Sequence, residues 1–182
     1  MSNSVKLVLF AVLLLQACGT EPDITAGDAP APRIDLGAHH DPAGFTIAYP
    51  TEWERLDTGE YPMVWSLQVG PGTNLLEKRM EIDVRDADGQ CRQSTYSAQL
   101  PGESRVTIGE TEFLKQAGSG VAAGNLYEWT SYSRTIDSNC ITITFVLHSS
   151  SSGGYATEPQ PFDHAAEGAV FGEIIDTFRL RP

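Results

Sequence analysis

The sequence has 182 residues, 41% of them apolar, and a formal net charge of −12 from 24 acidic and 12 basic residues. This length and composition fit one folded domain and exclude a wholly disordered chain. The acidic balance, with no cluster of Lys and Arg, excludes nucleic acid as an expected partner. It also makes peripheral binding to anionic lipid head groups unfavourable.

The first eighteen residues combine one basic residue, an apolar run and a cysteine. Lys6 precedes nine consecutive apolar residues at 7–15. A membrane-spanning helix needs about 20 apolar residues, so this run is too short to span a bilayer. Its layout is that of a secretory signal, with a positive start, an apolar centre and a small residue before a cut. We therefore expect residues 1–17 to be a signal peptide.

The residues that close this run, Leu15-Gln16-Ala17-Cys18, resemble the lipobox of bacterial lipoproteins. The resemblance implies cleavage before Cys18, a diacylglyceryl thioether on its sulfur and acylation, for example by palmitate, of its amino group. Two or three acyl chains make a lasting membrane anchor, because each buried methylene contributes about 0.8 kcal/mol. Gly19 in place of Asp implies outer-membrane sorting, facing the periplasm, in a Gram-negative host. The alternative is an ordinary signal peptide cut after Ala17.

The segment after the expected lipid attachment is rich in proline. Residues 18–43 contain four prolines and no Phe, Tyr or Trp, so we expect a flexible tether there. His39 and His40 stand at its end and are interpreted as tether residues. No cysteine or carboxylate at metal-ligand spacing completes a site around them. A single globular domain is expected over residues 44–182.

From Gly44 onward, apolar and polar residues alternate with the period of a β-strand. Turn sequences rich in Gly, Pro and Asp separate the runs, which indicates an antiparallel sheet with one buried face. We expect strands at residues 45–49, 63–69, 80–84, 106–108, 111–115, 126–134 and 141–147.

The C-terminal part of the chain follows a helical period instead. Asp163 suits a helix N-cap. After it, apolar residues recur at helical spacing: Ala166, Val170, Phe171, Ile174 and Phe178. We expect an amphipathic helix that covers the sheet, with His164 as a solvated residue of its first turn. A second, shorter helix is expected over residues 75–78.

The opening of the domain, Phe45-Thr46-Ile47-Ala48-Tyr49-Pro50 and then Trp53, resembles that of the PsbP-like α/β/α sandwich group. The closing residues, Thr177-Phe178-Arg179-Leu180, resemble that group's last strand. The resemblance implies an α+β fold, an antiparallel β-sheet covered by helices. The group is known for binding partners and shares no catalytic residue set, so the resemblance implies a binding module and carries over no site residue.

Three stretches have the outline of a chemical motif but lack the partners that the chemistry needs. Residues 118–123 follow the G-x-G-x-x-A pattern of a dinucleotide site, yet a predicted strand follows them instead of a helix, so we expect a hairpin loop. Residues 86–89 resemble a calcium loop that lacks its twelfth-position glutamate, so we expect a turn. His148 precedes a serine run, 149–152, with no third group to orient it. We expect no catalytic residue, no cofactor and no metal site.

Two further features concern cysteine and aromatic residues. If the chain is exported and Cys18 is acylated, Cys91 and Cys140 are the remaining thiols, and an oxidising compartment favours a disulfide between them. The alternative is two inert buried thiols. Tyr127, Trp129 and Tyr132 lie on one predicted strand, where we expect them to pack in the core or pair across strands, with a binding face as the alternative.

These observations predict a lipid-anchored protein of the bacterial cell envelope, held on the membrane through Cys18. A non-catalytic module that binds a protein partner or stabilises an assembly is the favoured function. Two alternatives stay open: a tethered hydrolase or other envelope enzyme, and an immunity or inhibitor lipoprotein. An enzyme requires a concave site with converging polar groups, so the shape of the folded domain discriminates between the first two classes.

Overall fold

The computed structural model of the chain describes residues 35–56, 61–69, 71–87, 89–93, 95–96, 102–150 and 159–181. The expected signal peptide, Cys18 and the first part of the expected tether lie outside these residues. So do Asp88 of the expected turn and the end of the serine run at 151–152.

Ten strands and one helix make up the described part of the chain. In chain order they are β1 (Leu36–Asp41), β2 (Phe45–Pro50), β3 (Glu54–Leu56), β4 (Met63–Gln68), β5 (Leu75–Asp86), β6 (Gly102–Ile108), β7 (Thr111–Ala122), β8 (Asn125–Ile136), β9 (Asn139–Ser150), α1 (His164–Ile175) and β10 (Arg179–Leu180).

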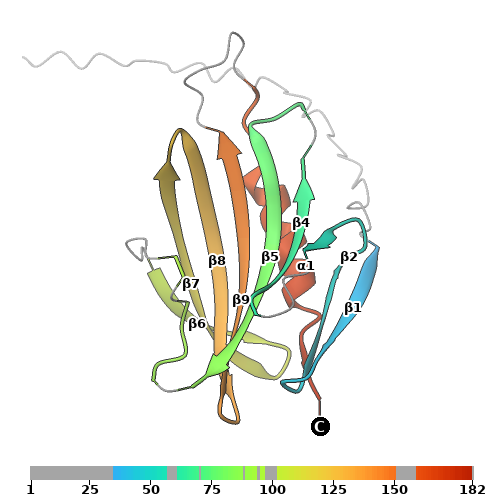
Figure 1. The fold of residues 1–182 in the computed structure, drawn as a ribbon, viewed down its shortest axis with the longest axis vertical. Coiled ribbons are helices and arrows are strands. Elements are labelled where there is room, and N and C mark those ends of the chain that lie inside the picture. The colour runs from blue at the N-terminus through green and yellow to red at the C-terminus, as the bar shows by residue number, and fades with distance from the viewer. Residues whose placement is uncertain are drawn as a thin grey trace, which may run out of the picture. The chain divides into compact units, whose positions relative to one another are not determined.

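Seven strands form one antiparallel sheet in the order β3-β4-β5-β9-β8-β7-β6. Four of them, β5, β9, β8 and β7, are twelve residues long and run side by side (Figure 1). Tight turns join β6 to β7 and β7 to β8. Gly109 and Gly124 stand in these turns with φ of 60° and 80°, a left-handed conformation that glycine adopts without a steric penalty.

A second sheet has the order β1-β2-β10. β1 pairs along its whole length with β2, and Ala38 lies opposite Ala48. The tether prediction is therefore wrong for residues 36–41. Their sequence, LGAHHD, carries no alternation of apolar and polar residues, so only the partner strand, which supplies the hydrogen bonds, determines that they are extended.

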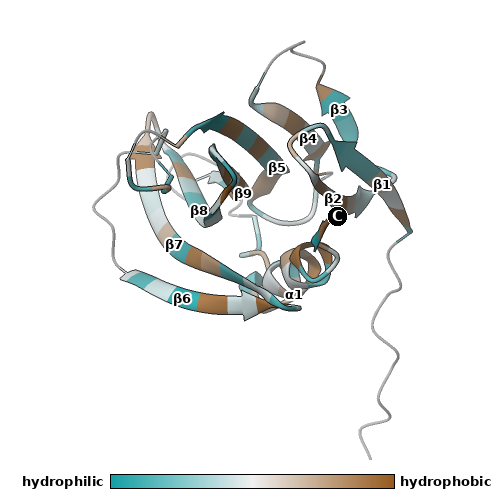
Figure 2. Cartoon of the chain, turned by 90° about the horizontal axis from the view of Figure 1, so that it is seen from below, coloured by the Kyte–Doolittle hydropathy of each residue, from teal (hydrophilic) through white to brown (hydrophobic). Residues whose placement is uncertain are grey.

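The hydrophobic core lies between the long sheet, α1 and β2. The sheet curves around α1, which lies against its concave face (Figure 2). The rings of Phe145 on β9 and Phe171 on α1 stack with their centroids 4.6 Å apart. Large side chains that are almost fully buried around them include Phe45, Ile47, Trp65, Met80, Ile82, Phe113, Ile143, Ile174 and Phe178.

The helix begins where its cap was predicted. The Oδ1 atom of Asp163 accepts hydrogen bonds from the backbone N–H groups of Ala165 and Ala166, at 2.9 and 3.1 Å. These bonds satisfy two of the donors that a helix start leaves unpaired. Ala166 is exposed, so the buried stripe of α1 begins further along, at Phe171.

The fold class expected from the sequence is wrong. The described part of the chain is mostly β, with α1 as its one helix, and is not an α+β sandwich whose sheet is covered by helices on both sides. Residues 75–78 also do not form the expected short helix. They begin β5, where Leu75 is 2% exposed on the core side. Pairing with two neighbouring strands, β4 and β9, outweighs the helical tendency of this short stretch.

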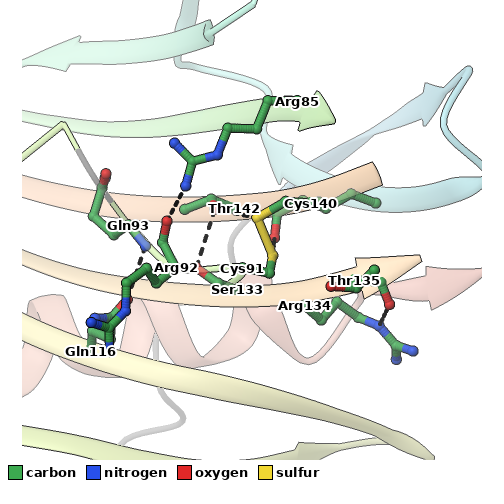
Figure 3. The surroundings of a disulfide bond; sticks show 11 residues. Arg85, Cys91, Arg92, Gln93, Gln116, Ser133, Arg134, Thr135, Cys140 and Thr142 are labelled. Atoms are coloured by element: carbon green, nitrogen blue, oxygen red, sulfur yellow. Dashed lines mark hydrogen bonds between the residues drawn. A yellow bond between two sulfur atoms is a disulfide. The ribbon is translucent and has the colours of Figure 1, made fainter. Parts of the chain in front are cut away.

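The face of the long sheet that points away from α1, here called the polar face, is covered without a helix. A bridging segment, residues 89–93 and 95–96, crosses it and is tied to β9 through Cys91 and Cys140, whose sulfur atoms are 2.11 Å apart, as the predicted disulfide requires (Figure 3). Beneath the segment, the Gln93 side chain donates to Thr144 Oγ1 at 2.9 Å. The expectation of a single buried face is therefore wrong for β9, because Thr142 and Thr144 are buried as well.

Candidate functional site

The cleft that carries the strongest functional signal opens on the polar face, beside the β7–β8 hairpin. Its volume is ≈ 450 Å³. Tyr96 of the bridging segment forms one wall, the hairpin forms the other, and Arg79 of β5 reaches it from the side. The residues that line it on the polar face include Arg79, Tyr96, Tyr127 and Trp129, with Gly120 opposite Tyr127. The chemistry of this cleft is aromatic with a polar border.

Trp129 fixes one end of the cleft by filling the space over a glycine. Gly118 of β7 lies opposite Trp129 of β8, and a Cβ atom placed on Gly118 would stand 2.6 Å from Trp129 Cζ2. The indole therefore lies where a side chain of residue 118 would otherwise be. Trp129 is 3% exposed and stacks on the ring of Tyr96, with centroids 5.8 Å apart. This pair holds the bridging segment against the sheet.

Tyr127 lies two residues earlier on the same face of β8 and has one covered and one open side. On the β9 side its ring stacks on His148, with centroids 4.4 Å apart and an angle of 12° between the planes. On the β7 side its partner in the register is Gly120. No atom lies within 4 Å of a Cβ placed on Gly120, so this space is empty, unlike that above Gly118.

A row of charged residues on β5 borders the cleft. Arg79 donates from Nε to Glu81 Oε1 at 2.7 Å, from Nη1 to Glu77 Oε2 at 3.1 Å, and from Nη2 to the Tyr96 hydroxyl at 2.9 Å. Tyr96 in turn donates to Glu81 Oε1 at 2.6 Å. These bonds fix the phenol that forms the cleft wall, and the single guanidinium is bonded by two carboxylates.

The same contacts shift the pKa values of two of these groups. Burial and the hydrogen bond to Glu81 raise the pKa of Tyr96 to about 12, although Arg79 acts in the opposite direction. Burial lowers the pKa of Arg79, but its bonds with Tyr96 and Glu81 outweigh burial, and the pKa stands above its ordinary value. Both groups are therefore in one fixed charge state near neutral pH.

Two buried ring nitrogens at the cleft have no hydrogen-bond partner within the part of the chain that the structure describes. They are Nε1 of Trp129, which lines the cleft, and Nε2 of His148, which lies behind Tyr127. An unpaired buried polar group costs about 1–3 kcal/mol of stability. Such groups are tolerated where a ligand supplies the missing partner, and their position beside an empty space points to binding.

Ser66, Glu77 and His148 contain the residue types of a hydrolytic triad, but in the wrong connectivity. Ser66 Oγ donates to Glu77 Oε1 at 2.8 Å, and the His148 Nδ1 atom lies 3.6 Å from Glu77 Oε2. The carboxylate thus stands between the serine and the imidazole. A nucleophilic serine needs the imidazole as its direct proton acceptor, so this arrangement does not activate Ser66.

A second group of titratable residues lies at the base of β1. Asp41 is 0% exposed and accepts from Tyr61 at 2.9 Å, from the Ala43 N–H at 2.8 Å, and contacts His39 Nε2 at 3.0 Å. Burial raises the pKa of Asp41, but the bonds from His39, Ala43 and Tyr61 outweigh burial and hold it below its ordinary value. Arg181 also bonds the Asp41 carbonyl. This cluster fastens β1 to the C-terminal segment, which is a structural role.

Two histidines and the glycine-rich stretch discussed in the sequence analysis lie outside any catalytic or metal-binding arrangement among the described residues. His39 does not belong to a tether: its ring packs on Trp65, with centroids 5.1 Å apart. His164 lies 3.6 Å from Glu128 Oε2 at the start of α1, and its side chain is 61% exposed. Of residues 118–123, expected to form a hairpin loop, most belong to strand β7, and the turn itself is at Ala123 and Gly124.

The aromatic cluster that was predicted to pack in the core divides between the two faces of β8: Tyr132 packs against the core, whereas Tyr127 and Trp129 line the cleft. The sequence pattern did not indicate the rest of the cleft. Gly118 and Gly120 match a dinucleotide pattern in the sequence. Two glycines at i and i+2 inside a strand lie on the same face, and that spacing was the available signal. The positions of Tyr96 and Arg79 depend on how the bridging segment crosses the sheet, which no local pattern shows.

Within the described residues, no group of three or more His, Cys, Asp and Glu side chains is arranged to hold a metal ion. No helix there is long and apolar enough to cross a membrane.

Comparison with known proteins does not assign this chain to a family. No protein-family model matches the sequence, and no curated protein matches it either. A solved structure that it resembles is a crystal structure from Bacteroides thetaiotaomicron at 1.50 Å resolution, with 19% sequence identity and a TM-score of 0.47. The match covers 80% of this chain and 48% of that one, so the chain spans about half the length of that protein.

Proposed function

We propose that this chain is a lipid-anchored module of the bacterial cell envelope that acts by binding, and that the cleft beside the β7–β8 hairpin is its binding site. The observation that carries the proposal is the empty space over Gly120, bordered by the open side of Tyr127 and by the buried, unpaired indole N–H of Trp129. A preformed concave site with aromatic walls and few polar groups is typical of ligand binding.

The membrane anchor is the second part of the proposal. It rests on the resemblance of Leu15-Gln16-Ala17-Cys18 to a lipobox. Catalysis is the less favoured function, because the Ser66–Glu77–His148 group at the polar face has the carboxylate between the serine and the imidazole.

A pair of glycine substitutions tests the binding site. Gly120→Val fills the empty space, and Gly102→Val places the same side chain in open space at the start of β6, outside the cleft. Both positions are in strands, where valine is favourable. The full-length variants are immobilised and exposed to solubilised envelope material from the host.

We expect the unmodified protein and Gly102→Val to retain the same material, and Gly120→Val to lose it while its circular dichroism spectrum is unchanged. Equal retention by all three proteins, or no specific retention by any, would overturn the proposal.

A further inference from the structure

The empty space over Gly120 is bounded along the strand, because the neighbouring position on the same face, Gly118, is covered by the indole of Trp129. Successive residues on one face of a strand are about 6.8 Å apart. Above Gly118 that interval is occupied by the indole of Trp129, and above Gly120 it is vacant. The vacancy is a slot about one ring wide, with the open side of Tyr127 along it and Trp129 at its end.

The charges at the slot select against ionic ligands. The one guanidinium that lines it, Arg79, already bonds Glu77 and Glu81, so an anion gains little attraction from it. A cation would have to approach that same guanidinium, and no carboxylate is among the described residues that line the cleft. The chain as a whole carries a net charge of −12, which further disfavours an anion. A neutral ligand fits these charges best.

The border of the slot carries polar groups that a purely apolar ligand would leave without hydrogen bonds. Trp129 Nε1 is a buried donor without an acceptor among the described residues. The Tyr96 hydroxyl, the Arg79 guanidinium and Ser119 also lie around the cleft. A ligand that presents a flat apolar face to Tyr127 and hydroxyl groups at its rim would satisfy the aromatic and the polar parts together.

We infer that the slot over Gly120 binds a neutral sugar ring of an oligosaccharide. The C–H face of a pyranose ring stacks on the open side of Tyr127, next to Trp129, and its hydroxyl groups bond the Tyr96 hydroxyl and the Arg79 guanidinium at the rim. The volume of the whole cleft, ≈ 450 Å³, accommodates more than one ring, so a short oligosaccharide is the expected ligand. This inference rests on the proposed binding function and names its ligand class.

The test follows the indole N–H signals of the full-length protein, labelled with ¹⁵N-tryptophan, in mild detergent. Chitotriose, cellotriose and maltotriose are titrated in turn. The chain has three tryptophans, and Trp53 and Trp65 are buried on the core side, so their signals serve as internal references. We expect at least one of the three sugars to shift the Trp129 signal saturably and to leave the other two in place.

Three variants define the site. Gly120→Val should weaken the affinity for that sugar about tenfold or more, since it occupies the ring position. Tyr127→Ala should weaken it by a similar factor, because it removes the ring on which the sugar stacks. Gly102→Val should bind unchanged. A saturable Trp129 shift that Gly120→Val leaves intact would contradict the inference.

The absence of a Trp129 shift with all three sugars would also overturn it, and the affinity experiment on envelope material then decides about the proposed function. If that material is a protein and is retained only when Gly120 is unsubstituted, the slot takes a protein side chain, so the sugar inference is wrong and the binding function stands. If nothing is retained specifically, both are wrong.

Discussion

Gly118 and Gly120 lie on the same face of β7, but the space over Gly118 is filled and the space over Gly120 is empty. Alanine substitutions at the two positions should therefore change the free energy of unfolding in opposite directions. In Gly118→Ala the new Cβ would stand 2.6 Å from Trp129 Cζ2 and 2.8 Å from Cε2, closer than real Cβ contacts allow. Trp129 is 3% exposed and stacked on Tyr96, so the indole cannot move without losing contacts. Overpacking of this kind costs about 1–3 kcal/mol.

In Gly120→Ala the Cβ meets nothing within 4 Å, and φ at this residue is not in the left-handed region. Replacing glycine inside a strand by alanine should then raise stability by about 0.5–1 kcal/mol, since the unfolded chain loses conformational freedom. The same gain applies at Gly118, so that variant should lose up to about 2.5 kcal/mol net. The two variants are expected to differ by about 1–3 kcal/mol.

Urea unfolding of the full-length protein in detergent, followed by tryptophan fluorescence, measures the difference. The midpoint should fall for Gly118→Ala and rise for Gly120→Ala, with the slope m unchanged. If Gly118→Ala proves as stable as Gly120→Ala, the indole does not lie over Gly118, and the assignment of an empty slot beside it is refuted as well.

Four further outcomes are expected. Cys18→Ala should release the protein into the soluble fraction and abolish palmitate labelling, whereas continued labelling of that variant would rule out the anchor. Denatured, non-reduced protein should show no titratable thiol from Cys91 or Cys140, and two free thiols would disprove the bond. Replacing both cysteines by alanine should lower the free energy of unfolding by about 4 kcal/mol, because the bond spans 49 residues. The pKa of Tyr96 is raised from an ordinary value of 10.0 to about 12 in the folded protein, so its protonated phenol should contribute stability that is complete below pH 10 and lost as the pH rises toward 12. In alkaline titration, Tyr96→Phe should lose less free energy of unfolding than the unmodified protein does. An equal loss would mean that Tyr96 is not the group responsible. The pKa of Asp41 is held below its ordinary value of 3.8, so its carboxylate should contribute stability that is present above pH 3.8 and lost as the pH falls below that value. Asp41→Asn should weaken this acid dependence of the free energy of unfolding, measured with urea at pH 2–5. An unchanged dependence would mean that Asp41 is not the group responsible.

The elements that sequence could predict are those whose signal is local. Alternation of apolar and polar residues located the strands that became β2, β4, β8 and β9. The Asp163 cap and the helix that follows it were predicted for the same reason, because a side chain that accepts from the next backbone N–H groups is a local interaction. The pairing of Cys91 with Cys140 was expected from the number of thiols alone.

What sequence could not predict depends on contacts between distant residues. β1 is a strand because β2 lies beside it, and its own residues carry no alternation. The expectation that helices cover the sheet failed because the bridging segment covers the polar face instead, with Gln93 buried against Thr144. The slot over Gly120 exists only in the register that places Tyr127 opposite it, and a shift by one residue would turn Tyr127 to the core side.

Binding through the cleft beside the β7–β8 hairpin is tested most directly inside the host. A photo-crosslinking amino acid replaces Ala122, which is exposed at the cleft on the same face of β7 as Gly120, and in a second strain it replaces Leu56, which is 44% exposed on β3. Irradiation of intact cells should give a discrete adduct from position 122, none like it from position 56, and loss of that adduct when Gly120→Val is added. The same adducts from both positions, or an adduct from position 122 that Gly120→Val leaves unchanged, would contradict the proposed binding site.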